Sequence, residues 1–221
     1  ALPILMEDII GYLKSLRRDY AGKELDVNSV DENPFHQLNL WLEEAVNAKI
    51  LDPNAMVVSS VGSDGMPSSR VVLMRGQTKS GIVFYTNYSS QKSKEIQSNP
   101  NVAVNFFWVE LDRQIRIIGE VKKVSRKQSQ EYFSSRPKDS QLAAIASSQS
   151  EVIGSRKELE HQFELLKEKY KNSSPQCPED WGGFEVMVNK FEFWQGRPNR
   201  MHDRIIYTKK GDNWQIQRLA P

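Results

Sequence analysis

Four short segments place arginine, lysine and hydroxyl side chains where a predicted strand ends or a predicted helix begins, and such donors suit phosphate groups. In the first segment, Arg70 and Arg75 flank the four apolar residues VVLM. A regular strand directs side chains five positions apart to opposite faces. Both arginines could bind anions if there are two separate anions or if a β-bulge brings the two side chains to one face. Alternatively, both could lie at solvated strand ends and bind nothing.

The second segment is YTNYSSQKSK, residues 85–94. A strand delivers Tyr85 and Thr86, and a helix follows with Lys92 in its first turn. The helix dipole disfavours a lysine at that end unless an anion binds there. This segment therefore indicates a phosphate site.

The third segment, YFSSRPKDSQ, spaces Tyr132, Arg136 and Ser140 four residues apart. On one helix these side chains would share a face, but Pro137 predicts that the helix ends there. Both an anion site and an ordinary surface turn stay open for this segment.

The fourth segment, FWQGRPNRMHDR, holds Trp194, Arg197, Arg200, His202 and Arg204 within eleven residues. Cations so close together would repel one another unless an anion or an aromatic ring neutralised them. A binding function is favoured here over a solvated surface.

Metal and hydrolytic chemistry find little support in the sequence. His36, His161 and His202 lie on three predicted elements without the spacing of metal ligands, and there is no cysteine pair, so we expect no metal site. The GxSxG, GxGxxG and P-loop signatures are also absent. Any nucleotide would therefore bind without a Rossmann or P-loop phosphate-binding loop.

Composition excludes several classes of protein. The 221 residues carry a net charge of +2 without a basic stripe, which argues against a nucleic-acid partner. The apolar runs fall well short of the roughly 20 residues that a membrane span needs. Glu7 and Asp8 stand where an export signal is basic and then apolar. The one cysteine, Cys177, fits a reducing compartment, so we expect a cytoplasmic protein.

Hydrophobic periodicity predicts the elements that must position these segments. A helix around Leu13 and a second one capped by Asn33 precede an antiparallel sheet, and further helices precede the closing strands. The late strands must pair with the central sheet, which predicts an α+β barrel. A Ser155–Glu158 capping box begins an amphipathic helix with Phe163 on its apolar face. The predicted strands are 55–61, 67–75, 81–87, two within 101–124, and 182–188, 190–196, 203–209 and 213–219.

Nine motifs, in register from Arg17 to Pro221, resemble the pyridoxine/pyridoxamine 5′-phosphate oxidase family. They are RVVLMR, FYTN followed by QK, RQIRI, YFSSRPKDSQ, SxQS at 147–150, WGGF, EFWQG, RMHDR and the terminal RLAP. The resemblance implies an FMN-binding split β-barrel, antiparallel and with flanking helices, and a homodimer with two flavins at the subunit interface. It also implies an N-terminal helix and lid in residues 1–33 and a single FMN-binding split-barrel domain in residues 34–221.

The resemblance also implies which residues bind. FMN would be bound by Arg70, Val71, Val72, Leu73, Met74, Arg75, Tyr85, Thr86, Gln91, Lys92, Gln114, Gln149, Ser150, Trp194 and Arg204. The substrate phosphate would be held by Arg75, Tyr132, Arg136 and Ser140. Arg200, Met201 and His202 would border the substrate ring, with Arg200 and His202 as the catalytic side chains, under a lid made of Arg17, Arg18, Asp19 and Tyr20.

The implied reaction oxidises C4′ of pyridoxine 5′-phosphate or pyridoxamine 5′-phosphate to give pyridoxal 5′-phosphate. A hydride passes to the flavin, O2 reoxidises the flavin and yields H2O2, and the amine also releases ammonia. The protein would chiefly position the reacting carbon and anchor the phosphate. Two alternatives keep the fold: a flavin oxidase of a phenazine-type pathway, which has no use for the phosphate cluster, and a non-catalytic barrel that binds flavin or pyridoxal phosphate, which would lack Arg200 and His202.

The chain departs from the family pattern at four positions. The family usually has lysine at Arg75, arginine at Gln91, glycine at Ala143 and leucine at Met201. Arg75 keeps the charge with a different geometry, and Met201 keeps the volume. Gln91 removes a positive charge near the flavin phosphate, so we expect weaker FMN binding. Ala143 matters only if that position needs a positive φ.

Overall fold

The computed structural model describes residues 6–16 and 18–221. Its helices are α1 (Met6–Ser15), α2 (Pro34–Asn47), α3 (Gln91–Ser98), α4 (Arg126–Ser135), α5 (Lys138–Ala146) and α6 (Arg156–Lys169), with short 3-10 helices at Val109–Leu111 and Pro198–Arg200. Its strands are β1 (Ala55–Val61), β2 (Pro67–Leu73), β3 (Gly76–Gln77), β4 (Gly81–Asn87), β5 (Asn101–Trp108), β6 (Arg113–Lys123), β7 (Trp181–Gln195), β8 (Asp203–Lys210) and β9 (Asn213–Leu219).

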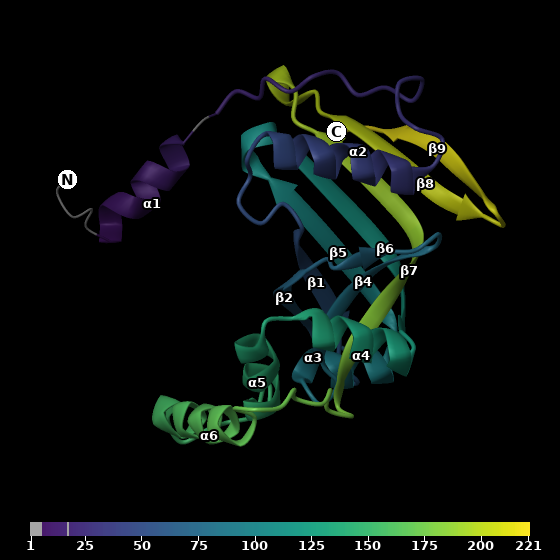
Figure 1. Cartoon of the computed structure of the whole chain (residues 1–221). Helices are drawn as coiled ribbons and strands as arrows, with labels where there is room; N and C mark the ends of the chain where they lie inside the picture. The colour runs from purple at the N-terminus through teal and green to yellow at the C-terminus, as the bar shows by residue number, and fades with distance from the viewer. Residues whose placement is uncertain (1–5, 17) are drawn as a thin grey trace.

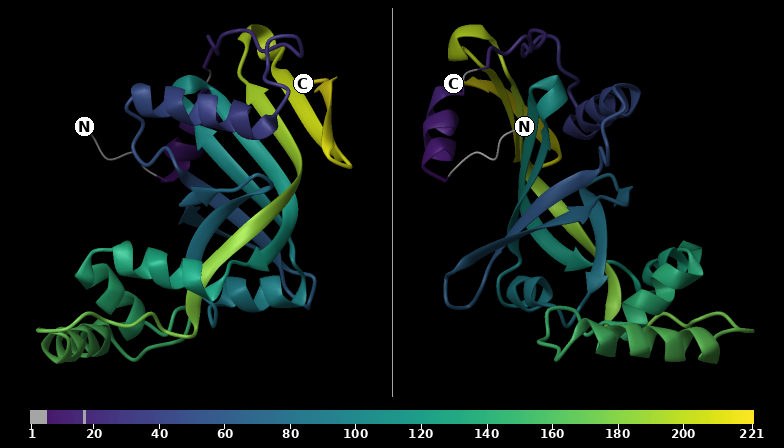
Figure 2. Two further views of the ribbon diagram at one scale, coloured as in Figure 1. Left: turned by 45° about the vertical axis from the view of Figure 1, so that its right-hand side comes forward. Right: turned by 90° about the vertical axis from the view of Figure 1, so that its left-hand side faces the viewer.

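The strands form one antiparallel sheet in the order β2-β1-β5-β6-β7-β4-β3, and β8 and β9 extend it from β7. Figures 1 and 2 show this sheet curled between α2 at one end and α3 to α6 at the other. The late strand β7 lies between β6 and β4, so the closing strands do pair with the central sheet as predicted. Within the described residues, no helix is long and apolar enough to cross a membrane.

The core lies on the inner face of the curled sheet. Alternate residues of β5 and β6 are buried, including Phe106 and Ile115, while their neighbours face outward. Helix α2 covers this face with Leu38 and Trp41, and the Trp41 ring meets the Phe193 ring edge-on at 5.2 Å. Burying each such side chain contributes about 1.5–3 kcal/mol, which fixes the sheet as a rigid support for the outward residues.

Strand β7 corrects one prediction. The pattern predicts two strands, 182–188 and 190–196, but the structure has one continuous strand with a register shift opposite Ile118 and Gly119. Asn189 is the extra residue, because Ile118 pairs with Lys190 and Gly119 pairs with Val188. A bulge absorbs one residue without ending a strand. A side chain at position 119 would meet a backbone oxygen of β7 at 2.2 Å, so glycine permits this close approach.

The outer helices contribute little to the core. Figures 1 and 2 show α1 standing away from the sheet, and its Ile10 and Leu13 are exposed. Helix α6 buries none of its side chains. Its predicted cap is present in a modified form, because Ser155 accepts the N–H of Glu158 at 3.4 Å while the Glu158 carboxylate accepts the N–H of Gly154.

Candidate functional site

A cavity of about 920 Å³ opens where β2 and β4 meet helices α3 to α6. The first three cationic segments of the sequence all reach it, although they lie on different elements. Acidic side chains from α6, Glu160 and Glu164, line its far side. Thirteen of the predicted binding residues line the cavity: Arg70, Val71, Val72, Leu73, Arg75, Tyr85, Thr86, Gln91, Lys92, Tyr132, Arg136, Gln149 and Ser150.

Arg70 and Arg75 converge on this cavity because the strand ends between them. The predicted strand runs to residue 75, but β2 ends at Leu73. The Arg75 N–H then donates to the Val83 carbonyl at 2.7 Å, and the chain turns there. The end of the strand, and not a bulge within it, brings both guanidinium groups to one space.

Lys92 is a buried cation whose acceptors are all neutral. Its side chain lies in the first turn of α3, and the residue is 8% exposed. The Nζ atom donates to Gln149 Oε1 at 2.6 Å, Thr86 Oγ1 at 3.0 Å and Ser90 Oγ at 3.2 Å. Burial, together with the charge of Arg70, lowers the pKa of Lys92 from 10.5 to about 8. An anion in the cavity would remove the cost of burying this charge.

Arg136 supplies a second cation to the cavity. Its Nη1 atom is buried and has no hydrogen-bond partner among the described residues. Its guanidinium lies over the Trp181 ring at 4.9 Å, and burial lowers the pKa of Arg136. The Tyr132 ring stacks on Tyr85 at 3.8 Å beside it. A buried donor without an acceptor is a place where a ligand oxygen fits.

Among the predicted residues of the first three segments, Met74 and Ser140 do not line the cavity, whereas Trp181, which was not predicted to bind, does. Met74 packs against the core. Ser140 lies in the first turn of α5, because the helix break at Pro137 separates it from Tyr132. Trp181 lines the cavity and orients Arg136, but only its aromatic type at the start of a strand marked it in the sequence. Ala143 also lines the cavity; it lies in α5 without a positive φ, so glycine is not needed there.

A second cluster forms on β6, β7 and β8. Gln114, Trp194 and Arg204 stand in one cross-strand row, in register and half-exposed. The Arg204 Nε atom donates to the Glu192 carboxylate at 2.8 Å, which fixes its direction. This row brings together three residues that were predicted to bind the cofactor, from three separate strands.

Aromatic contacts join this row to His202. The Tyr20 ring meets the rings of Trp194 and His202 edge-on, at 5.8 Å and 5.1 Å. His202 Nδ1 accepts the N–H of Arg197 at 3.1 Å. Burial and the Arg200 charge lower the pKa of His202. The imidazole is therefore neutral near pH 7 and carries its proton on Nε2.

The predicted lid is attached to the same cluster. Arg18 forms an ion pair with Asp112, whose carboxylate also accepts the Ala21 N–H at 3.2 Å. Arg197 donates to the Gly22 carbonyl at 2.7 Å. Arg17, also predicted in the lid, lies outside the described residues. A second cavity of about 540 Å³ is lined by Leu16, Arg18, Asp19, Tyr20, Asn199, Arg200 and His202, while Met201 is 68% exposed.

The first cavity and the second cluster lie apart in a single chain. None of the described residues lines both cavities. Figures 1 and 2 show the segment that follows α1 crossing the end of the sheet near α2, whereas α3 to α6 surround the other end. The predicted cofactor residues are therefore divided, with Gln114, Trp194 and Arg204 away from the first cavity.

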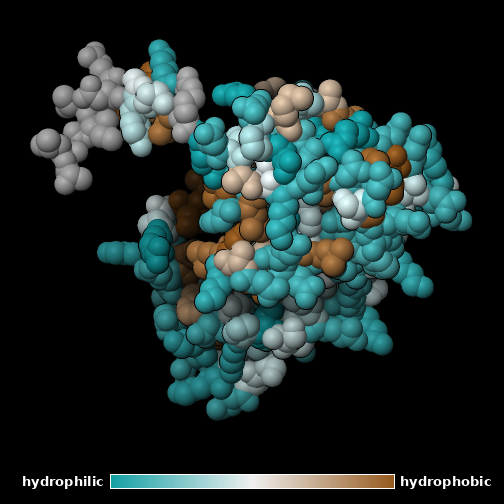
Figure 3. All heavy atoms as spheres, turned by 90° about the horizontal axis from the view of Figure 1, so that it is seen from above, coloured by the Kyte–Doolittle hydropathy of each residue, from teal (hydrophilic) through white to brown (hydrophobic). Residues whose placement is uncertain are grey.

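On the outer face of the sheet, large apolar side chains lie exposed in the single chain. Val71 is 66% exposed and Phe107 is 59% exposed on it, and Asn105 has a buried Oδ1 atom with no partner among the described residues. Figure 3 shows apolar side chains gathered in a hollow beside the N-terminal helix. Exposed apolar surface of this kind is typical of a protein interface.

Two family profiles match the chain. The one described as "Pyridoxamine 5′-phosphate oxidase" matches residues 42–170, and the one described as "Pyridoxine 5′-phosphate oxidase C-terminal dimerisation region" matches residues 181–221. The chain is 48% identical over 209 residues to pyridoxine/pyridoxamine 5′-phosphate oxidase 2 of Hydrogenovibrio crunogenus, covering 95% of this chain and 98% of that protein. It is 46% identical to the oxidase of Thermosynechococcus vestitus, covering 95% and 99%.

Solved structures confirm the fold. PhzG from Burkholderia lata, in complex with tetrahydrophenazine-1-carboxylic acid, superposes with a TM-score of 0.85 at 24% identity, covering 90% of this chain and 99% of that one. A pyridoxamine 5′-phosphate oxidase-related, FMN binding protein of Nostoc punctiforme superposes with a TM-score of 0.68 at 14% identity, covering 87% and 99%. The predicted α+β split barrel is therefore confirmed, and the dimerisation region supports the predicted homodimer.

Proposed function

The chain belongs to the pyridoxine/pyridoxamine 5′-phosphate oxidase family, and from that premise we propose that it oxidises pyridoxine 5′-phosphate and pyridoxamine 5′-phosphate to pyridoxal 5′-phosphate, with O2 as the electron acceptor. As a member it is an oxidoreductase whose cofactor is FMN. The observation that carries the proposal is the pair of cationic positions in one cavity, Lys92 and Arg136, neither of which contacts an anionic side chain among the described residues. Two phosphates, one on FMN and one on the substrate, would satisfy them.

The two positions suit different phosphates. Lys92 and Arg70 lie where the first turn of α3 faces β2, and we assign them to the phosphate of FMN. Arg75, Tyr132 and Arg136 line the same cavity and would hold the phosphate of the substrate. Anchoring a non-reacting phosphate supplies binding energy that fixes the reacting carbon in place.

A second copy of the chain would complete the site. We propose that the apolar outer face pairs with its equivalent in the homodimer, and that the second cluster of one copy faces the first cavity of the other. FMN would then lie at the subunit interface, with Gln114, Trp194 and Arg204 from the second copy. The uncovered Val71 and Phe107, and the dimerisation region that begins at Trp181, support this arrangement.

The chain's own residues would chiefly bind and orient the substrate. Bound FMN would accept the hydride from C4′ and pass its electrons to O2. His202 has its Nδ1 atom occupied by the Arg197 N–H, so its Nε2–H is free to donate toward the substrate. This supports a role for His202 as a hydrogen-bond donor that orients the substrate. Arg200 and the Tyr20 ring adjoin it and would exclude water over the bound ring.

The direct test uses the purified, FMN-loaded protein. Incubation with pyridoxine 5′-phosphate in air should produce an absorbance of pyridoxal phosphate together with an equal amount of H2O2. If the protein remains colourless after incubation with FMN, the cofactor assignment fails. If it binds FMN but forms neither aldehyde nor peroxide, the non-catalytic barrel is favoured, and oxidation of a reduced phenazine precursor alone would favour the phenazine-type pathway.

The pKa of Lys92 predicts how FMN affinity depends on pH. Below about pH 8 the amine is protonated and can pair with a phosphate, and above that value the free protein loses the charge. We therefore expect the Kd for FMN to rise about tenfold between neutral pH and about pH 9.5, the loss of one charged hydrogen bond. Flavin fluorescence quenching measures this Kd. A Lys92→Arg variant keeps its charge and should show a flat profile, and a flat profile in the unaltered protein would contradict the assignment.

A further inference from the structure

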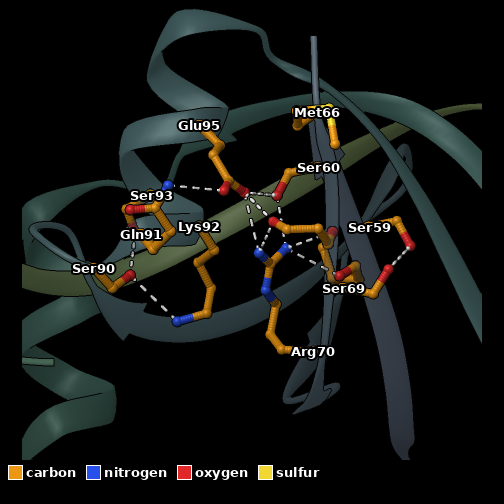
Figure 4. A network of polar contacts seen from close by, with 12 residues as sticks. Ser59, Ser60, Met66, Ser69, Arg70, Ser90, Gln91, Lys92, Ser93 and Glu95 are labelled. Atoms are coloured by element: carbon orange, nitrogen blue, oxygen red, sulfur yellow. Dashed lines mark hydrogen bonds and ion pairs between the residues drawn. The ribbon is translucent and has the colours of Figure 1, made fainter. Parts of the chain in front are cut away.

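Glu95 is a buried carboxylate behind the phosphate end of the cavity. It lies on α3, is 6% exposed and does not line the cavity itself. Its Oε2 atom accepts from Ser60 at 2.5 Å, Ser68 at 2.6 Å and Arg70 Nη2 at 3.1 Å, and its Oε1 atom accepts from Gln91 Nε2 at 3.0 Å. Figure 4 shows Glu95 reaching from α3 toward Arg70, with Lys92 extending beside them.

This network immobilises the guanidinium of Arg70. Nη1 donates to Ser60 Oγ at 2.6 Å and to the Val58 carbonyl at 3.1 Å, while Nη2 donates to Ser68 Oγ and to Glu95. Both terminal nitrogens are thus held by the protein, and the plane of the group is set before any ligand arrives. A donor fixed in advance loses less entropy on binding.

The network also determines the charge that faces the cavity. Burial alone would raise the pKa of Glu95, but hydrogen bonds from Ser60, Ser68, Gln91 and Arg70 lower it to about 2, so the carboxylate is ionised. Its charge supports protonation of Lys92, against the effects of burial and of Arg70. Gln91 contacts Glu95 as a neutral amide, so Arg70 is the only cation that Glu95 contacts among the described residues.

We propose that Glu95 is a positioning residue for cofactor binding: its carboxylate fixes Arg70 and Gln91 so that Arg70 and Lys92 meet a phosphate monoester in one prearranged geometry. The inference rests on the proposed placement of the FMN phosphate at Arg70 and Lys92. Positioning and simple charge attraction predict opposite effects on FMN affinity when the Glu95 charge is removed. Removing a negative charge near a phosphate site would strengthen binding by Coulomb's law alone, whereas removing a positioning residue weakens it.

The test is the Glu95→Gln variant, with FMN and riboflavin as matched probes. Riboflavin has the same ring system without the phosphate. For FMN we expect the Kd of the variant to rise about fivefold or more at neutral pH, the cost of ordering a freed side chain, with riboflavin binding unchanged. Asp212→Asn, at an exposed carboxylate in the turn between β8 and β9, changes the net charge equally and should leave both affinities as they are.

Each other outcome decides the matter. Tighter FMN binding by Glu95→Gln would overturn positioning in favour of charge alone. An equal loss of FMN and riboflavin affinity would overturn it as well, because the effect would then not act through the phosphate. If the unaltered protein binds FMN no more tightly than riboflavin, the phosphate placement itself fails. Should Glu95→Gln not fold, Ser68→Ala removes one of the two hydroxyls, those of Ser60 and Ser68, that contact both Arg70 and Glu95, and unchanged FMN affinity there would contradict the proposal.

Discussion

Replacing Arg136 with alanine should raise the KM for pyridoxine 5′-phosphate by about 10- to 150-fold, which corresponds to about 1.5–3 kcal/mol for a lost hydrogen bond to a charged group. The reason is the position of its guanidinium, which has a buried Nη1 without a partner and is held over Trp181 in the cavity. We expect little change in kcat, because a phosphate contact is made equally in the ground state and the transition state. Steady-state rates of aldehyde formation, measured with saturating FMN, give both parameters.

Two controls separate lost phosphate binding from a damaged fold. Pyridoxine without its phosphate should react with the unaltered enzyme and with Arg136→Ala at similar low kcat/KM. Arg136→Lys keeps the charge but loses the planar group that stacks on Trp181. Its KM for pyridoxine 5′-phosphate should therefore lie between those of the unaltered enzyme and Arg136→Ala. An unchanged KM in Arg136→Ala would remove Arg136 from the phosphate site.

The sequence located the cations of the first cavity well, because a lysine at a helix start and arginines at strand ends are locally unusual. Hydrophobic periodicity could not predict that these cationic side chains meet in one cavity, because it does not show where each strand ends. Arg70 and Arg75 converge only because β2 ends at Leu73. Trp181 and Glu95 carry no such signal, since an aromatic residue at a strand start and a glutamate on a helix are ordinary.

The fold was predictable at the level of class and element order, and less so in its registers. A strand pattern shows which residues share a face but not which strand lies next to it. Gln114, Trp194 and Arg204 were therefore predicted from family resemblance alone. Only the pairing of β6, β7 and β8 shows that they are neighbours on the sheet. The bulge at Asn189 escaped prediction for the same reason, since it exists only relative to the partner strand.

The division of the site between two clusters leads to the second prediction, which concerns mixed dimers. Arg136→Ala disables the first cavity and Arg200→Ala disables the second cluster, so each homodimer should be nearly inactive at low substrate concentration. A twofold dimer that contains one chain of each kind collects both defects in one site and leaves the other site intact. Such heterodimers, isolated with two different affinity tags, should recover about half of the activity of the unaltered dimer.

The opposite pairing supplies the decisive control. When both substitutions are placed in one chain and that chain is paired with an unaltered one, each site of the heterodimer receives one defect, so activity should be nearly absent. If each chain carried a complete site of its own, the results would be reversed, with no recovery in the first heterodimer and half of the activity in the second. The two constructions contain the same four side chains at positions 136 and 200, and differ only in which chain carries them. A difference in activity between them therefore measures where the clusters meet, independently of how much either substitution weakens folding.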